Sequence, residues 1–163
     1  MRQIVVMLVG GHGVGKTSTV KALSLGSGTR RCLTVPAGEQ QYVLVEYSNI
    51  TVIQIESNMS PTIALPSLLE ADKLNKPVIL DAYAYSPGWV YALNVLRPRL
   101  IAVKYKVSLG ESMNRISARA GLALDRQIKH LNGAIGRARL TVKRLHRSGL
   151  YIDWIEVNDN HTP

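Results

Sequence analysis

A glycine-rich stretch that follows directly on an apolar run constrains the fold of this chain more than any other feature. Residues 4–9 read IVVMLV and lead into GGHGVGKT at 10–17, which fits the phosphate-loop (Walker A) pattern G-x-x-x-x-G-K-[ST] without a mismatch. The next residues, STVKALSL at 18–25, are compatible with a helix. A buried strand, a glycine loop and a helix in this order predict an α/β fold with a ligand site at the carboxyl end of a strand.

The residue types in this loop predict a nucleotide site, with a ligand-free glycine turn as the alternative. Glycines let successive backbone N–H groups turn inward and form an anion site at the positive end of a helix. Lys16 is expected to reach the β- and γ-phosphates of ATP or GTP, and the Thr17 hydroxyl to bind Mg²⁺. His12 occupies a variable position of the motif and is interpreted as a spacer. The residues expected to contact the nucleotide are Gly10, Gly11, His12, Gly13, Val14, Gly15, Lys16, Thr17 and Ser18.

The apolar run 77–80 ends in Asp81, the second residue with predicted chemistry. In proteins with a phosphate loop, an acid at the end of such a strand typically holds Mg²⁺ directly or through water, so Thr17 and Asp81 are the predicted metal ligands. Capping of the next turn is the alternative role for Asp81. Two roles are open for the aromatic cluster that follows: stacking on a base, or packing in the core or an interface. Its members are Tyr83, Tyr85, Trp89 and Tyr91.

Hydrophobic periodicity and turn residues predict a chain in which strands alternate with helices. Strands are expected at 4–9, 31–35, 42–46, 50–56, 77–81, 100–107 and 151–157. Helices are expected from 15–17 to about 26, at 66–74, before Arg97-Pro98, at 108–120 and at 125–148, with a loop at 58–66. The turn residues 47–49 predict an antiparallel hairpin between the third and fourth strands. This order predicts one domain over 1–163, a phosphate-loop NTPase three-layer sandwich with a mostly parallel sheet.

Length and composition agree with a single domain. The 163 residues are 46% apolar, enough for one core. Cys32 is the single cysteine, so no internal disulfide is expected and a reducing, cytoplasmic setting is predicted. No stretch of the sequence approaches the length that spans a bilayer, so no membrane partner is expected.

Positive charge is concentrated in the second half of the chain. Residues 97–147 hold thirteen of the twenty lysines and arginines and only two acidic residues, so this segment carries +11 and the rest of the chain −2. Such a segment is expected to face an anionic partner, which is the nucleotide itself, a nucleic acid or a protein. A solvated helix face is the alternative.

With these motifs in place, the chain outside 40–66 resembles the phosphate-loop kinases, most closely thymidylate and related nucleoside monophosphate kinases. GGHGVGKTST is similar to their nucleotide loop, and VILDAYAYSPGWVYAL to their strand followed by an Asp-Arg-Tyr motif. Residues 97–121 are similar to their arginine-bearing helix that leads into a lid, and LDR at 124–126 to the Leu-Asp-Arg of the lid itself.

This resemblance implies a phosphotransferase that uses ATP and Mg²⁺. In such enzymes Lys16 and Thr17 would hold ATP and Mg²⁺, and Asp81 would organise the metal or the acceptor. The arginines implied to stabilise charge on the transferring phosphoryl group are Arg115, Arg119 and Arg126.

Two departures from the kinase pattern support a second resemblance. Ala82 stands where the motif has an arginine that grips the acceptor, with Arg30 or Arg31 as candidate substitutes, and a hairpin replaces helices at 40–66. A hairpin after the phosphate loop is similar to Ras-like small GTPases, with Thr34 in the place of their switch threonine. The sequence lacks their Asp-x-x-Gly and Asn-Lys-x-Asp motifs, so a GTPase switch or a nucleic-acid-associated NTPase without kinase activity ranks second. A homodimer through the hairpin or the aromatic cluster is also open.

Overall fold

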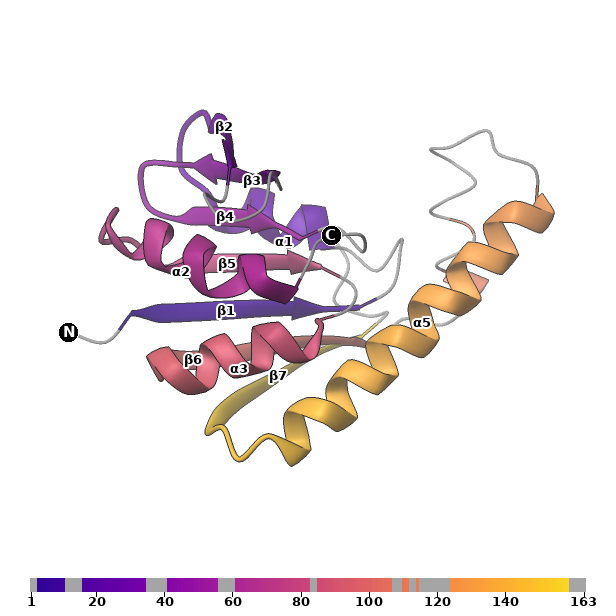
Figure 1. Cartoon of the computed structure of the whole chain (residues 1–163). Coiled ribbons are helices and arrows are strands. Elements are labelled where there is room, and N and C mark those ends of the chain that lie inside the picture. The colour runs from indigo at the N-terminus through magenta and orange to yellow at the C-terminus, as the bar shows by residue number, and fades with distance from the viewer. Residues whose placement is uncertain are drawn as a thin grey trace.

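The computed structural model has an α/β fold in which helices pack on both faces of one sheet (Figure 1). It describes residues 3–10, 16–34, 41–55, 61–82, 85–106, 110–111, 114 and 124–158, and of residues 41, 61, 124–132 and 134 only the backbone. The described strands form a seven-stranded sheet in the order β2-β3-β4-β5-β1-β6-β7. Their bounds are β1 Ile4–Val9, β2 Thr29–Thr34, β3 Gln41–Glu46, β4 Thr51–Gln54, β5 Val78–Ala82, β6 Arg99–Lys106 and β7 Ile152–Asn158. The prediction of an α/β fold with a mostly parallel sheet is therefore confirmed.

The parallel part of the sheet runs from β4 through β5, β1 and β6 to β7. Its central strands are continuous apolar runs because side chains on both of their faces are covered, as in β1, whose last residues are all buried. After β1 the chain goes to one side of the sheet, returns through β4 and β5, and then crosses to β6 and β7 on the other side. The connection after β1 therefore runs toward the β2 edge of the sheet and the connection after β5 runs toward the β7 edge, although β1 and β5 are neighbours.

The predicted hairpin is confirmed as an antiparallel pairing of β3 and β4, and β2 adds a third antiparallel strand. The turn of the hairpin is tied to the end of the first helix by Asn49. Its Nδ2 donates to the Leu23 carbonyl oxygen at 2.7 Å, and its Oδ1 accepts from the Leu25 N–H at 2.9 Å. The bond to Leu23 satisfies a carbonyl group that the end of a helix leaves unpaired, and the helix ends at Leu23 rather than near Gly26 as predicted.

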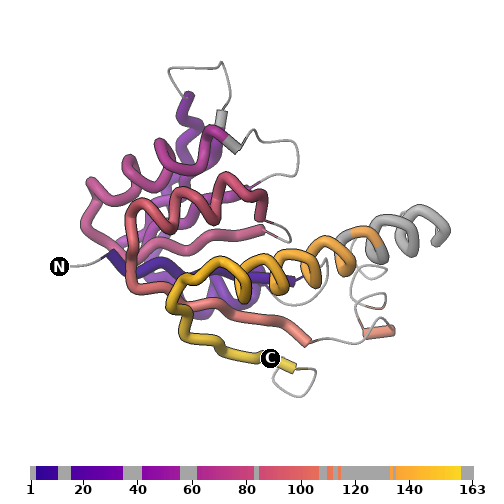
Figure 2. The backbone as a smooth tube through the Cα atoms, turned by 60° about the horizontal axis from the view of Figure 1, so that its bottom comes forward, coloured from indigo at the N-terminus to yellow at the C-terminus, as the bar shows by residue number. Residues whose placement is uncertain are grey.

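The helices are α1 Lys16–Leu23, α2 Ala64–Asp72, α3 Pro87–Leu96 and α5 Leu124–Arg147, with a 3-10 helix, η1, at Pro61–Ile63. Figure 2 shows α2, α3 and α5 side by side on one face of the sheet. They cover the larger apolar cluster, which includes Leu68, Trp89 and Leu145. Val20 of α1 belongs to the smaller cluster on the opposite face, with Leu8 and Ile79. The two clusters confirm three layers in the described part of the chain.

The boundaries of the long carboxyl-terminal helix agree with the sequence pattern to within one residue. The prediction was 125–148, and α5 spans Leu124–Arg147. Leu145 is buried and Ile135 and Val142 are half-buried, as the three- and four-residue spacing of apolar residues predicts. The stacked rings of His146 and Trp154, with centroids 4.6 Å apart, pack the end of α5 on β7. Within the described residues no helix has the length and apolar character needed to cross a membrane.

The predicted loop at 58–66 is wrong over its described part. Residues 61–63 form η1, and α2 begins at Ala64. The proline-rich composition suggested irregular chain, but proline is tolerated in the first turn of a helix because that turn has no partner for its N–H. Of the two adjacent leucines of α2, Leu68 is buried in the core and Leu69 is exposed. Residues 56–60 and most of the predicted helix at 108–120 lie outside the described residues, although Gly110, Glu111 and Asn114 are helical.

Candidate functional site

The candidate site lies at the carboxyl ends of β1 and β5, two neighbouring strands that the chain leaves for opposite faces of the sheet. β1 is followed by α1 on one face, and β5 by α3 on the other. The parallel register pairs Leu8 with Asp81 and Val9 with Ala82. Asp81 is therefore next to the strand end that carries the phosphate-loop sequence. Adjacent strands with diverging connections create the crevice in which open α/β sheets usually bind ligands.

Lys16 and Asp81 interact electrostatically at this crevice. Lys16 is the first residue of α1, and its Nζ donates a hydrogen bond to the Gly10 carbonyl oxygen at 2.8 Å. Burial lowers the pKa of Lys16 to about 8, while the Asp81 charge acts in the opposite direction and raises it. Burial likewise raises the pKa of Asp81, and the Lys16 charge lowers it. The structure thus brings together the predicted phosphate-binding lysine and the predicted metal-binding acid.

Thr17 and Ser18 follow Lys16 in the first turn of α1, and both side chains are exposed. The amino end of a helix favours anions because its first N–H groups lack partners within the helix. Among the described residues there is no group of three His, Cys, Asp or Glu side chains that could hold a metal ion. Mg²⁺ commonly takes one or two protein oxygens and completes its octahedron with phosphate and water. Thr17 and Asp81 fit that mode of binding.

Tyr85 connects the strands of the site with the long helix α5. Its hydroxyl lies 2.9 Å from the carbonyl oxygen of Leu8 and 2.8 Å from that of Leu80, so it bridges β1 and β5 just before their ends. Its backbone N–H donates to the Thr141 hydroxyl at 3.1 Å, and its carbonyl oxygen accepts from Nη1 of Arg144 at 2.7 Å. Burial raises the pKa of Tyr85 well above its ordinary value, so the hydroxyl remains a donor. The sequence analysis placed Tyr85 in an aromatic cluster but did not detect this bridge.

The two roles considered for the aromatic cluster are now separated for three of its members. Tyr85 and Trp89 are buried and pack edge to face, with ring centroids 6.5 Å apart and planes at 83°. They belong to the core, so stacking of either ring on a base is the wrong alternative. Tyr91 is 65% exposed, and Tyr83 lies outside the described residues.

A second hydroxyl contact fixes α1 against the sheet. The Thr19 Oγ1 and the Tyr105 hydroxyl form a hydrogen bond between α1 and the carboxyl end of β6. Burial raises the pKa of Tyr105 to about 12. Since Thr19 is one turn after Lys16, this bond holds the amino end of α1 in place. The sequence pattern predicted the strand but contained no signal for the role of Tyr105.

Several predicted site residues cannot be placed. The loop residues Gly11, His12, Gly13, Val14 and Gly15 and the arginines Arg115 and Arg119 lie outside the described residues. Arg126 is in the first turn of α5, where only the backbone is described.

The two arginines considered as substitutes for the missing motif arginine lie away from the crevice. The position of the missing arginine is taken by Ala82, which is buried in the core at the end of β5. Arg30 and Arg31 are in β2, which is separated from β5 by β3 and β4, about 14 Å at the usual strand spacing. The Arg31 Nη2 pairs with the Glu46 Oε2 at 2.6 Å. Thr34, the counterpart of a switch threonine, ends the same distant strand. The described structure therefore brings neither of the two arginines nor Thr34 to Asp81.

No protein-family model matches the chain, and no curated protein matches it either.

Proposed function

We propose that this chain is a Mg²⁺-dependent nucleotide-binding phosphotransferase that moves the γ-phosphoryl group of ATP to a small, nucleotide-like acceptor. The observation that supports the proposal most directly is the pairing of Lys16 and Asp81 at the diverging ends of β1 and β5. A cation and an acid at this position are the parts that phosphoryl transfer requires to neutralise the phosphates and to hold the metal. The thymidylate-kinase-like order of motifs in the sequence agrees with it.

In the proposed mechanism the protein positions reactants and neutralises charge, because the loose transition state of phosphoryl transfer needs little covalent help. Lys16 contacts the β- and γ-phosphates from the amino end of α1. The Thr17 hydroxyl and the Asp81 carboxylate would hold Mg²⁺, which would supply positive charge to neutralise the phosphates. Tyr85 and the Thr19–Tyr105 bond keep these groups at fixed positions. The proposed source of further positive charge is the set Arg115, Arg119 and Arg126.

A product assay tests this proposal. Purified protein is incubated with Mg²⁺-ATP or Mg²⁺-GTP, alone and with each nucleoside monophosphate, and nucleoside diphosphate is separated from free phosphate. We expect transfer to one acceptor that falls by about 100-fold in Asp81→Asn, since a carboxylate that holds the metal is lost. The matched control is Asp153→Asn, which removes an exposed carboxylate from β7 and is expected to change the rate by less than about twofold. Nucleotide binding that is equal in wild type and Lys16→Ala would refute the phosphate-loop interpretation.

The second candidate is a nucleotide-dependent switch without an acceptor. The antiparallel β2-β3-β4 segment and Ala82 in place of an arginine favour it over a kinase. The same assay separates the two, because a switch releases free phosphate at a rate that no nucleoside monophosphate changes.

A further inference from the structure

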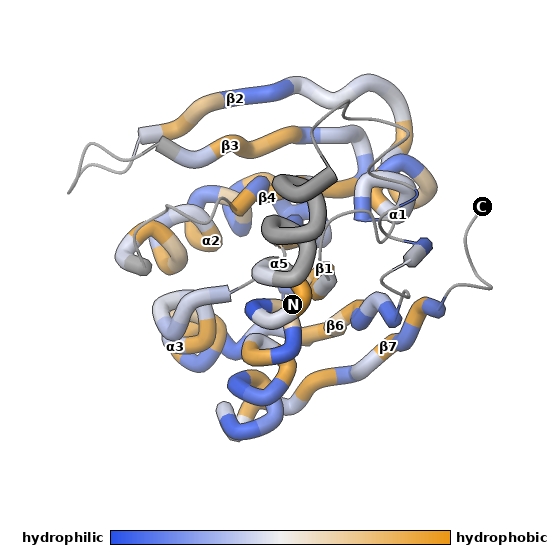
Figure 3. Tube along the Cα trace, turned by 90° about the vertical axis from the view of Figure 1, so that its right-hand side faces the viewer, coloured by the Kyte–Doolittle hydropathy of each residue, from blue (hydrophilic) through white to orange (hydrophobic). Residues whose placement is uncertain are grey.

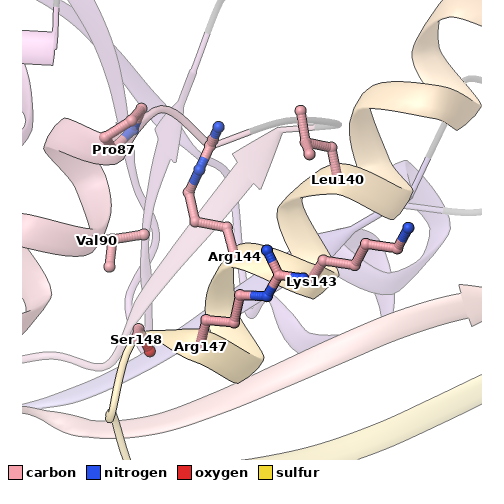
Figure 4. A pocket seen from close by; sticks show the side chains of 7 residues that line it. All are labelled: Pro87, Val90, Leu140, Lys143, Arg144, Arg147 and Ser148. Atoms are coloured by element: carbon pink, nitrogen blue, oxygen red, sulfur yellow. The ribbon is translucent and has the colours of Figure 1, made fainter.

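A groove between α3 and α5 combines an apolar wall with a cationic rim. It has a volume of about 450 Å³ and lies on the face of the sheet opposite α1 (Figure 4). The side chains that line it come from the start of α3 and the end of α5: Pro87, Val90, Leu140, Lys143, Arg144, Arg147 and Ser148. Figure 4 shows Arg144 extending between the two helices, whereas Lys143 points away from α3. The groove is separate from the Lys16–Asp81 crevice.

The cations of the groove differ in whether they already bind another part of the protein. Arg144 donates to the Tyr85 carbonyl oxygen, so it holds the start of α3 while its charge remains at the groove. Lys143 and Arg147 are exposed, and neither forms an ion pair with a described residue. Their charges are therefore available to a partner.

These cations belong to a longer series along α5. Arg139, Lys143 and Arg147 are all exposed and follow one another at four-residue steps, so they share one face of the helix. We call these three residues the α5 cation row; it extends over about 12 Å at the rise of an α-helix. Figure 3 shows hydrophilic stretches interrupted by hydrophobic ones along the described part of α5. The sequence has no Asp or Glu between residues 125 and 153, so no acid within α5 after its second residue offsets this charge.

We propose that the α5 cation row and the adjoining groove bind a single strand of nucleic acid. A row of this length exceeds one phosphate group and matches a partner with repeated negative charge. Pro87, Val90 and Leu140 provide an apolar wall on which an unpaired base can pack, which the stacked bases of a duplex cannot use. A peptide of acidic residues alone would satisfy the cations but would have no flat group to cover the apolar wall. This inference is independent of the proposed phosphotransferase activity.

Fluorescence anisotropy with a labelled oligothymidine strand tests the proposal. We expect binding at about 50 mM salt that weakens about 50-fold at about 200 mM, as for four phosphate contacts on a single strand, three from the α5 cation row and one from Arg144. The double variant Lys143→Ala/Arg147→Ala should bind at least about 10-fold more weakly, with a salt slope smaller by about 1.4. The control Lys21→Ala/Arg30→Ala removes the same charge from exposed positions on α1 and β2 and should retain the wild-type slope to within about 0.5. Equal melting temperatures of the two double variants show that folding is intact.

Four outcomes would overturn the proposal. They are no binding at low salt, an equal loss of affinity in both double variants, tighter binding of the corresponding duplex, and equally tight binding of polyglutamate of the same charge. The last result would assign the surface to an acidic protein instead.

Discussion

The Lys16–Asp81 pair and the α5 cation row are two charged regions that differ in burial and in the signs of their charges. In the first, one cation and one acid are largely withdrawn from water, and burial lowers the pKa of Lys16 and raises that of Asp81. In the second, three cations of one sign stand in solvent along a helix. A buried charge acts strongly on one atom of a ligand because water does not screen it, whereas exposed charges act by their number and are screened by salt.

This comparison assigns different tasks to the two regions. The crevice suits chemistry at a defined atom, because hydrogen bonds to Gly10, Leu8 and Leu80 fix its parts. The cation row suits a partner that is recognised by charge over a distance. Tyr85 links the two regions. Its hydroxyl bridges the strands of the site, and its carbonyl oxygen accepts a hydrogen bond from Arg144 of α5.

The largest expected effect comes from Lys16→Ala. Loss of this partly buried cation should reduce Mg²⁺-ATP affinity or turnover by at least about 100-fold, because no other described cation is placed at the crevice to replace it. Binding of the oligothymidine strand should be unchanged, since Lys16 belongs neither to the groove lining nor to the α5 cation row. Isothermal titration with each ligand measures both effects, with Lys21→Ala as the control on the same helix. A parallel loss of both affinities would show that the two regions form one site.

Tyr85→Phe should have the next largest effect. The change removes the hydroxyl between two buried carbonyl oxygens and is expected to lower the free energy of unfolding by about 1–2 kcal/mol. Urea denaturation measures it. The matched variant is Tyr91→Phe, which removes the hydroxyl of an exposed tyrosine on α3 and should change stability by less than about 0.5 kcal/mol. Equal effects in the two variants would argue that the bridge between β1 and β5 contributes nothing.

The pH dependence of nucleotide affinity should be of similar size. With a pKa of about 8, Lys16 is mostly charged at about pH 7 and mostly neutral at about pH 9, so Mg²⁺-ATP affinity should fall about 10-fold over that range. The Asp81 charge raises the pKa of Lys16, so Asp81→Asn should move the midpoint to lower pH. Titrations at a series of pH values give the midpoint. A midpoint that stays the same or rises in Asp81→Asn would contradict the coupling of the pair.

The smallest expected effect is on the stability of the Lys143→Ala/Arg147→Ala variant. Exposed charges without an ion-pair partner in the described structure contribute little to folding, so the melting temperature should stay within about 2 °C of wild type. Differential scanning calorimetry measures it. A large decrease in melting temperature would mean that the α5 cation row stabilises the fold instead of serving to bind a partner.

Local sequence patterns predicted most of the secondary structure. The apolar run of β1, the turn residues of the hairpin and the periodic spacing of α5 each place their element within a residue or two of its observed position. One error involves a distant contact, and the other a local composition that allows either a loop or a helix. Asn49 ends α1 early, and proline-rich residues continue into α2 rather than a loop.

What the sequence by itself determined was the phosphate-loop motif with Lys16 and Thr17, an acid at a strand end in Asp81, and an excess of positive charge in 97–147. These signals are local, since each depends on residue types at short spacing. The tertiary structure alone decided that β5 lies next to β1, that Tyr85 bridges them, and that α3 and α5 enclose a groove. Strand order and helix packing depend on which apolar surfaces are buried together, and contacts between residues far apart in the chain leave no periodic trace in the sequence.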